Sequence, residues 1–175
     1  MRKILLLSDT HGYIDEAICR YASEADEIWH AGDIGSIIVY DALAGIKPVK
    51  AVYGNIDGRE IRTICPENQI FTCEKKKIWI THIGGYPPNY NPTLKQLLKE
   101  TKPDIFICGH SHILKVIFDK NLNLLHINPG AAGTHGFHIV RTMVRFTIDG
   151  EDIKNMDVIE LGKRAEKEDD NIKEK

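Results

Sequence analysis

The sequence lacks the features that mark secreted, membrane-spanning and disulfide-stabilised proteins. None of its apolar runs approaches the roughly 18 residues that a membrane helix requires. The run at residues 4–7 stops at a carboxylate, whereas the apolar core of a secretion signal needs ~7–15 residues. The four cysteines, Cys19, Cys65, Cys73 and Cys108, form no Cys-x-x-Cys pair. We therefore interpret residues 4–7 as part of a buried strand and expect reduced thiols in a cytoplasmic protein.

An excess of charge of either sign is also missing. The 175 residues include 23 Lys and Arg against 25 Asp and Glu, and the formal net charge is −2. Because no basic field is present, we expect neither nucleic acid nor a membrane surface as a partner. The length suits one domain with its own core, which we place at residues 1–160. The charged segment 161–175 has no apolar period and is predicted to be a disordered tail.

Aliphatic runs alternate with helical patterns over the first two-thirds of the chain. Strands are predicted at residues 3–7, 27–30, 49–53, 77–81 and 105–108, and helices at residues 15–23, 37–44 and 93–100. This alternation predicts an α/β fold with strands buried between layers. Four further strands are predicted at residues 114–119, 124–128, 141–149 and 153–160. We expect them to form an antiparallel set that completes or stacks on the first sheet.

Metal-binding residue types follow the predicted strands at regular intervals of 22 to 28 residues. They are Asp9 and His11, then Asp33, Asn55 and His82, and finally His110 and His112. Loops at the carboxyl ends of strands in an open α/β fold gather on one edge, so these side chains should converge. Each motif alone is also explained by turn or capping chemistry. Together, imidazole, carboxylate and amide ligands without thiolate favour a pair of Mn, Fe, Ni or Zn ions.

These motifs resemble the signature of the calcineurin-like metallophosphoesterases. The matching motifs are, in order, Asp9-x-His11, Gly32-Asp33, Gly54-Asn55, Thr81-His82 and Gly109-His110-x-His112. The segment from His126 to Gly130 resembles the small bacterial and archaeal branch of that family, which includes phosphodiesterases. The resemblance covers the chain to about residue 148. It implies a four-layer αββα sandwich of two mixed β-sheets flanked by helices.

The resemblance also implies a role for each ligand. One divalent ion would be held by Asp9, His11, Asp33 and His112, and the other by Asp33, Asn55, His82 and His110. Asp33 would bridge the ions and position an attacking hydroxide, and Asn55 would contact the substrate phosphate. Mn is the first expectation for both ions, with Ni, Fe or Zn as alternatives.

The third motif departs from the family pattern. Many members have Gly-Asn-His there, whereas this chain has Gly54-Asn55-Ile56. Ile56 cannot protonate a leaving group, and general acid catalysis is worth ~10²–10⁴ in rate. We therefore expect phosphodiesters or activated aryl phosphates to be better substrates than phosphomonoesters with poor leaving groups. Small members of the family often lack this histidine too.

Three other residues are candidate substrate contacts: Asp57, His135 and His138. A turn or helix cap is the alternative for Asp57, and a solvated loop is the alternative for the two histidines. His30 and His126 lie in predicted strands and are interpreted as structural residues, and Cys108 as a core thiol.

The sequence thus predicts a metal-dependent phosphodiesterase that acts on a small phosphorylated substrate. One alternative is a phosphomonoesterase with the same centre. Another is a protein-interaction module, like the retromer subunit that resembles this family but has lost ligands. The seven intact ligands favour an enzyme. The physiological substrate, the native metal and the oligomeric state stay open, and a homodimer or larger homo-oligomer is among the alternatives.

Overall fold

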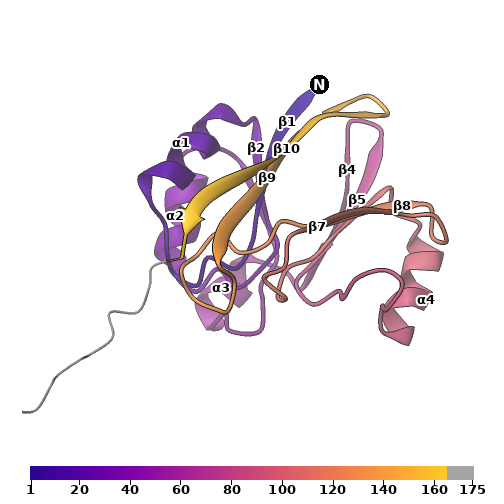
Figure 1. The fold of residues 1–175 in the computed structure, drawn as a ribbon, viewed down its shortest axis with the longest axis horizontal. Coiled ribbons are helices and arrows are strands. Elements are labelled where there is room, and N and C mark those ends of the chain that lie inside the picture. Colours follow the sequence, from indigo (N-terminus) through magenta and orange to yellow (C-terminus); the bar gives the residue numbers. More distant parts are fainter. Residues whose placement is uncertain (165–175) are drawn as a thin grey trace, which may run out of the picture.

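Two five-stranded β-sheets face each other in the computed structural model, which describes residues 1–164 (Figure 1). Sheet A has the order β10-β9-β1-β2-β3, with β1 Arg2–Leu7, β2 Glu27–His30, β3 Val49–Ala51, β9 Val140–Asp149 and β10 Asp152–Lys163. Sheet B has the order β4-β5-β6-β8-β7, with β4 Asn68–Cys73, β5 Lys76–Thr81, β6 Ile105–Ile107, β7 Lys115–Asp119 and β8 Leu124–Asn128. The helices are α1 Glu16–Glu24, α2 Ile37–Ala44, α3 Arg59–Ile64 and α4 Pro92–Thr101.

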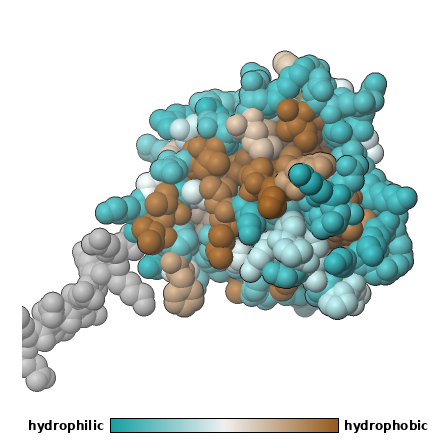
Figure 2. All heavy atoms as spheres, turned by 45° about the vertical axis from the view of Figure 1, so that its right-hand side comes forward, coloured by the Kyte–Doolittle hydropathy of each residue, from teal (hydrophilic) through white to brown (hydrophobic). Residues whose placement is uncertain are grey.

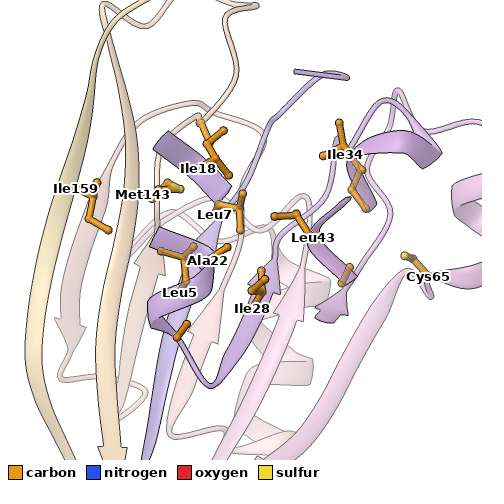
Figure 3. Packing of buried hydrophobic residues seen from close by; sticks show 14 of the residues in the cluster. Leu5, Leu7, Ile18, Ala22, Ile28, Ile34, Leu43, Cys65, Met143 and Ile159 are labelled. Atoms are coloured by element: carbon orange, nitrogen blue, oxygen red, sulfur yellow. The ribbon is translucent and has the colours of Figure 1, made fainter. Parts of the chain in front are cut away.

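Strand β1 shows why its sequence is continuously apolar. Leu5 and Leu7 belong to the core between sheet A and helices α1 and α2, whereas Ile4 and Leu6 belong to the core between the sheets. Figure 3 shows the first of these cores, with labelled side chains of β1 and β2 facing those of α1 and α2. A strand that is covered on both faces has no position for a solvated polar residue.

Helix α4 covers the outer face of sheet B. Leu94 and Leu98 pack against Trp79 and Phe106 of the sheet. The helix begins at Pro92, one residue before the predicted start at residue 93, and the Asn91 side chain accepts a hydrogen bond from the amide of residue 94. The layers are therefore helices, sheet A, sheet B and helix, which confirms the predicted αββα sandwich of two mixed sheets.

Strand direction places the carboxyl ends of the central strands together. Strands β1, β2 and β3 run parallel in sheet A, and β5, β6 and β8 run parallel in sheet B. The loops that leave β1, β2, β3, β5 and β6 carry the predicted ligands, so the topology delivers them to one end of the sandwich.

The last third of the chain differs from the prediction of one antiparallel set. β7 and β8 form a hairpin in sheet B, β9 and β10 form a hairpin in sheet A, and β8 pairs parallel with β6. The four strands lie close to their predicted positions, but the chain changes sheet between β8 and β9. β10 ends at Lys163, beyond the predicted domain end at residue 160. From residue 165 on, the predicted tail lies outside the described residues.

Two elements, α3 and β4, were not predicted. Helix α3 has only six residues and no side-chain N-cap hydrogen bond, so neither helical periodicity nor a cap marks it. Strand β4 joins β5 through a tight turn with Glu74 at φ 55°, where an Asn-Gly pair would be the usual signal. Within residues 1–164, no helix is both long and apolar enough to span a bilayer.

Candidate metal centre

The structure brings all seven predicted ligands together in two adjoining clusters. The first contains Asp9, His11 and His112, and the second contains Asp33, His82 and His110. Within each cluster the ligand atoms lie within 4.8 Å of one another. The seventh ligand joins the second cluster, since Asn55 Oδ1 lies 3.1 Å from His82 Nε2.

Asp33 lies between the two clusters. Its Oδ1 is 3.2 Å from His82 Nε2, and its Oδ2 is 3.7 Å from His11 Nε2. Burial opposes the charge of this carboxyl group, but the His82 hydrogen bond and charge outweigh burial and lower its pKa. The same pairing raises the pKa of His82 against the opposing effect of burial. Asp33 thus presents one oxygen of an ionised carboxylate to each cluster.

The first cluster has the chemistry of a cation site. His112 Nε2 lies 3.2 Å from Asp9 Oδ1 and 3.3 Å from His11 Nε2. Burial lowers the pKa of His11, which favours the neutral imidazole that binds metal ions. Asp9 Oδ1 is buried and accepts no hydrogen bond from the residues that the structure describes. Because buried polar atoms are normally satisfied, a divalent cation between these three groups fits the site.

Five of the seven ligands have a backbone in the left-handed region. The φ angles are 54° at Asp9, 48° at His11, 53° at Asp33, 68° at His110 and 58° at His112. Each such residue costs about 1 kcal/mol relative to a right-handed conformation. Strain of this kind persists only where the surroundings hold it, and its concentration in the ligand loops is typical of a functional site.

Glycine precedes three of the ligands. Two of these glycines, Gly32 and Gly54, are needed for different reasons. Gly32, before Asp33, has φ 94° and so allows the sharp turn that its position in the sequence predicts. Gly54, before Asn55, has no such φ, but a Cβ there would collide with the Asp33 carboxylate. Its small size therefore allows the β3 loop to approach the β2 loop closely.

Known proteins are similar to this chain, and their family matches a metal centre of this kind. The family model of the calcineurin-like phosphoesterase superfamily domain matches residues 2–151. The chain belongs to this superfamily. A probable metallophosphoesterase of Methanothermobacter thermautotrophicus is 28% identical over 162 residues, which cover 90% of this chain and 91% of that protein.

Two solved structures superpose on most of the chain. An archaeal phosphodiesterase has a TM-score of 0.67 at 24% identity and covers 91% of this chain and 99% of its own. Vps29 from Entamoeba histolytica has a TM-score of 0.73 at 16% identity and covers 91% of this chain and 99% of its own. At these identities the two structures establish the shared fold.

Asp57 connects two loops of the candidate site through its hydrogen bonds to backbone amides. It is buried, and its carboxylate accepts hydrogen bonds from the amides of Ile34 (3.1 Å), Gly35 (2.7 Å) and Gly54 (2.7 Å). These amides belong to the Asp33 and Asn55 loops. Because both oxygens are engaged by backbone groups, the structure does not support the prediction of a substrate contact. The alternative of local turn chemistry describes Asp57 better, although its contacts extend to a second loop.

Substituting Asp57→Asn should lower the free energy of unfolding by about 2 kcal/mol, because the amide group retains only one accepting oxygen for three charge-assisted hydrogen bonds. For a domain of this size the midpoint of thermal unfolding should fall by about 5 °C. Thermal melts of the variant and of Asp41→Asn, at an exposed carboxylate on α2, would measure the difference. Equal midpoints for the two variants would contradict this role.

His138 determines which nitrogen of His112 faces the first cluster. His138 Nε2 lies 3.0 Å from the Gly133 carbonyl, which can only accept, so this nitrogen carries the proton. Burial lowers the pKa of His138, so its Nδ1 is left as an acceptor. His112 Nδ1 lies 3.3 Å from that atom and must donate. The lone pair of His112 Nε2 is thereby directed at Asp9 and His11.

Replacing His138 with phenylalanine should weaken metal binding by ~10–100-fold, the usual effect of removing a partner that orients a metal ligand. Phenylalanine retains most of the ring volume but offers no acceptor to His112 Nδ1. Titration of the metal-free variant with Mn²⁺ would measure this loss. His135→Phe is the control, because the exposed His135 ring lies 4.9 Å from the His11 ring without a hydrogen bond to a ligand among the described residues. Unchanged affinity in His138→Phe would contradict the role.

The two candidate substrate contacts in the 133–139 loop therefore have different positions. His135 is exposed beside His11, which leaves it able to meet a substrate. His138 is engaged with His112 and Gly133 and lies behind the ligands.

Sequence reasoning missed two residues that support the ligand loops. Asn128 donates to the Gly109 carbonyl at 2.9 Å and to Ser111 Oγ at 3.1 Å, which holds the loop of His110 and His112. Arg62 of α3 donates to the carbonyls of Asp57 (2.6 Å) and Gly54 (3.2 Å) in the Asn55 loop. A polar residue at the end of an apolar strand, before Pro-Gly, could have indicated Asn128. Arg62 lies in the unpredicted helix and had no such signal.

His30, His126 and Cys108 are structural, as predicted. His30 is buried, accepts a hydrogen bond from the Gly32 amide at Nδ1 and contacts Thr10 Oγ1 at 3.0 Å through Nε2. His126 is buried beside Tyr90 and Cys108 on the α4 side of sheet B. Burial raises the pKa of the Cys108 thiol to about 12, so the thiol is protonated and inert.

Proposed function

We propose that this chain is a binuclear metallophosphodiesterase that hydrolyses a small phosphate diester. The observation that carries the proposal is the position of Asp33, whose two carboxylate oxygens face separate clusters of histidine and aspartate ligands. Carboxylate bridging between two such clusters is the arrangement of two-metal hydrolytic sites.

We propose that the residues would divide between two ions in the way that the resemblance implied. Asp9, His11 and His112 would hold one ion, His82, His110 and Asn55 the other, and Asp33 both. When bound, two divalent ions would lower the pKa of water at the centre, which would supply a hydroxide nucleophile toward phosphorus near neutral pH. We expect Mn²⁺, with Ni²⁺, Fe²⁺ or Zn²⁺ as alternatives, because the ligands are nitrogen and oxygen atoms without thiolate.

The surroundings of the second cluster fit a phosphate ester. Asn55 is exposed at the edge of the centre, where its amide group can donate to a phosphate oxygen. A cavity of about 250 Å³ adjoins it and is lined by Asn55, His82, Thr81 and Arg62, among others. This cavity offers room for one alcohol group of the ester.

The preference for an activated diester rests on two observations, of which Ile56 concerns the leaving group. Its side chain is 46% exposed beside Asn55, at the position where many family members carry a histidine. Without an imidazole at this position, a leaving group of low pKa is favoured over a poor one. The fold shared with an archaeal phosphodiesterase supports the same preference. The complete set of converging candidate ligands argues against the alternative of a protein-interaction module.

The test combines metal content with hydrolysis on one purified sample. After chelation, Mn²⁺ is added back, and turnover of bis(p-nitrophenyl) phosphate is compared with that of p-nitrophenyl phosphate. We expect two ions per chain, loss of activity on chelation, recovery with Mn²⁺, and faster turnover of the diester. Faster turnover of the monoester would instead support a phosphomonoesterase. If the chain binds none of the four ions and none of them activates it, the proposal is overturned and an interaction module is favoured.

A further inference from the structure

The cavity beside the second cluster differs in character from the exposed surface of sheet B. Apolar side chains gather across the face of the molecule that Figure 2 turns forward. The cavity, of about 250 Å³, is lined by eight residues, six of which carry polar or charged side chains. Its walls come from the β3 loop, α3, the residue before β4 and the end of β5. Because Asn55 and His82 are candidate metal ligands, a group that fills the cavity lies next to the metal centre.

Thr81 offers this cavity a buried hydroxyl group without a partner. It is the last residue of β5, precedes His82, and is only 7% exposed. Its Oγ1 forms no hydrogen bond within residues 1–164, where Asp9 Oδ1 is the one unpartnered atom of a buried or half-buried side chain that is sealed from solvent. The Thr81 hydroxyl is therefore reached from the cavity that this residue lines. Since buried polar groups are normally satisfied, the cavity calls for an occupant with hydrogen-bonding groups.

Two opposite charges that line the cavity are not paired with each other. The Arg62 guanidinium donates to two backbone carbonyls of the β3 loop, and its Cζ lies 4.4 Å from the centroid of the Tyr53 ring. Its third nitrogen, Nη1, donates to none of the residues that the structure describes. The Glu67 side chain likewise has no hydrogen-bond or ion-pair partner in the described part of the chain. The cavity thus presents a free donor and a free acceptor in addition to the Thr81 hydroxyl.

This set of groups disfavours both charged and hydrocarbon alcohols. An anionic alcohol would be attracted by Arg62 but repelled by Glu67, and a cationic alcohol would meet the reverse. A hydrocarbon group would leave the buried Thr81 hydroxyl unsatisfied, at the cost of its desolvation. An uncharged hydroxyl group can donate to Glu67 and accept from Arg62, and Thr81 can do either. An alcohol with several hydroxyl groups therefore satisfies all three side chains.

We propose that the cavity binds the retained alcohol of the diester, and that this alcohol is an uncharged polyol of about the size of a sugar ring. The inference rests on the proposed function and names its class of substrate. At ~30 Å³ per water molecule the cavity holds roughly eight waters, which suits an alcohol of about that many non-hydrogen atoms. The polyol is the retained group because its hydroxyl has a high pKa, and Ile56 offers no proton to a departing alkoxide.

The first experiment compares two 4-nitrophenyl diesters on the Mn²⁺-loaded protein. One is esterified to the primary hydroxyl of methyl ribofuranoside and the other to cyclopentylmethanol, so they share a leaving group and a ring size. We expect kcat/KM to be ~100-fold higher for the riboside diester, because a site built to bind hydroxyl groups rejects an analogue without them.

The outcomes of this comparison separate the inference from the proposed function. Equal kcat/KM for the two diesters would overturn the inference and leave the proposed function standing. Hydrolysis of neither diester would overturn both. Faster turnover of the 4-nitrophenyl diester of serine, whose alcohol is a zwitterion, would overturn the assignment of an uncharged polyol.

Two substitutions test whether the cavity is the source of the preference. Thr81→Val keeps a branched side chain in β5 but removes the hydroxyl, and should lower the preference for the riboside ~3–10-fold, the equivalent of one neutral hydrogen bond. Glu67→Gln should lower it ~10–100-fold, because hydrogen bonds to a charged group are stronger. Both losses should be in KM, since these side chains bind the retained alcohol and not the reacting atoms.

The matched controls are Thr72→Val and Glu60→Gln, at exposed positions outside the cavity, which should keep the wild-type preference. A preference that is unchanged in both Thr81→Val and Glu67→Gln, or that is lost through kcat alone, would overturn the inference.

Discussion

Replacing Asp33 by asparagine should lower the hydrolysis of bis(p-nitrophenyl) phosphate by ~10³-fold or more, about 4 kcal/mol, even at saturating Mn²⁺. The amide retains the size of the carboxylate, and its carbonyl can still accept the hydrogen bond from the Ile56 amide. However, it carries no charge and has only one good ligand oxygen. Since Asp33 presents one oxygen to each cluster, the substitution removes a ligand common to both.

The matched variant is His112→Ala, which removes a ligand of the first cluster alone. Its activity should recover in part as Mn²⁺ is raised, because the second cluster and Asp33 remain. Initial rates over a Mn²⁺ titration, together with metal content, distinguish loss of affinity from loss of the bridge. Equal residual rates for the two variants at saturating metal would contradict the bridging role of Asp33.

The metal-free protein should lose about 3 kcal/mol of unfolding free energy for each of two buried histidines between pH 7 and pH 4. Burial lowers the pKa of His30 to about 4 and that of His126 to about 4, whereas a histidine in the unfolded chain titrates near ~6.5. The unfolded chain therefore takes up these protons first as the pH falls. The stabilisation is complete above pH ~6.5 and is lost as the pH approaches about 4.

The contacts of His30 explain why the folded protein resists protonation. Its Nδ1 accepts from the Gly32 amide, and its Nε2 donates to Thr10 Oγ1, which in turn donates to the Ile34 carbonyl. A second proton on the ring would place two donors against each other at Nδ1. Acid should thus disturb the loops of Asp9 and Asp33 together.

Urea unfolding at pH 7, 5 and 4 in the presence of a chelator would measure this pH dependence. His126→Gln, which has no titrating ring, should show a pH dependence smaller by about 3 kcal/mol over this range. His135→Gln, at an exposed position, should keep the wild-type dependence. A His126→Gln variant as acid-sensitive as wild type would show that the burial of this ring is not linked to stability.

The convergence of the candidate ligands could be predicted from the sequence because each one follows a recognisable apolar strand. Asp33 and His110 also follow glycine, and parallel strands bring their loops to a common edge without further information. The roles of Asp57 and His138 could not be predicted in this way. Both depend on contacts between loops 23 and 26 residues apart, and no periodicity in the sequence reports how such loops meet.

The elements of the last third were predicted, but their sheet assignment was not. The aliphatic and β-branched residues of β8 and β9 indicate strands, yet they do not reveal that the segment between them crosses from sheet B to sheet A. Likewise, α3 is too short to show a helical period, although Arg62 on it contacts the Asn55 loop. These features are set by packing between distant segments, which local propensity does not encode.

The ligands come from both halves of the sandwich. Asp9 and Asp33 follow strands of sheet A, whereas His82, His110 and His112 follow strands of sheet B. The apolar core between the sheets resists their separation. Bound ions would tie the two sheets at one end and fix their relative offset, so a shift of one sheet past the other would change every distance across the centre. The geometry of the candidate metal centre therefore depends on how firmly the two sheets are held in register with each other.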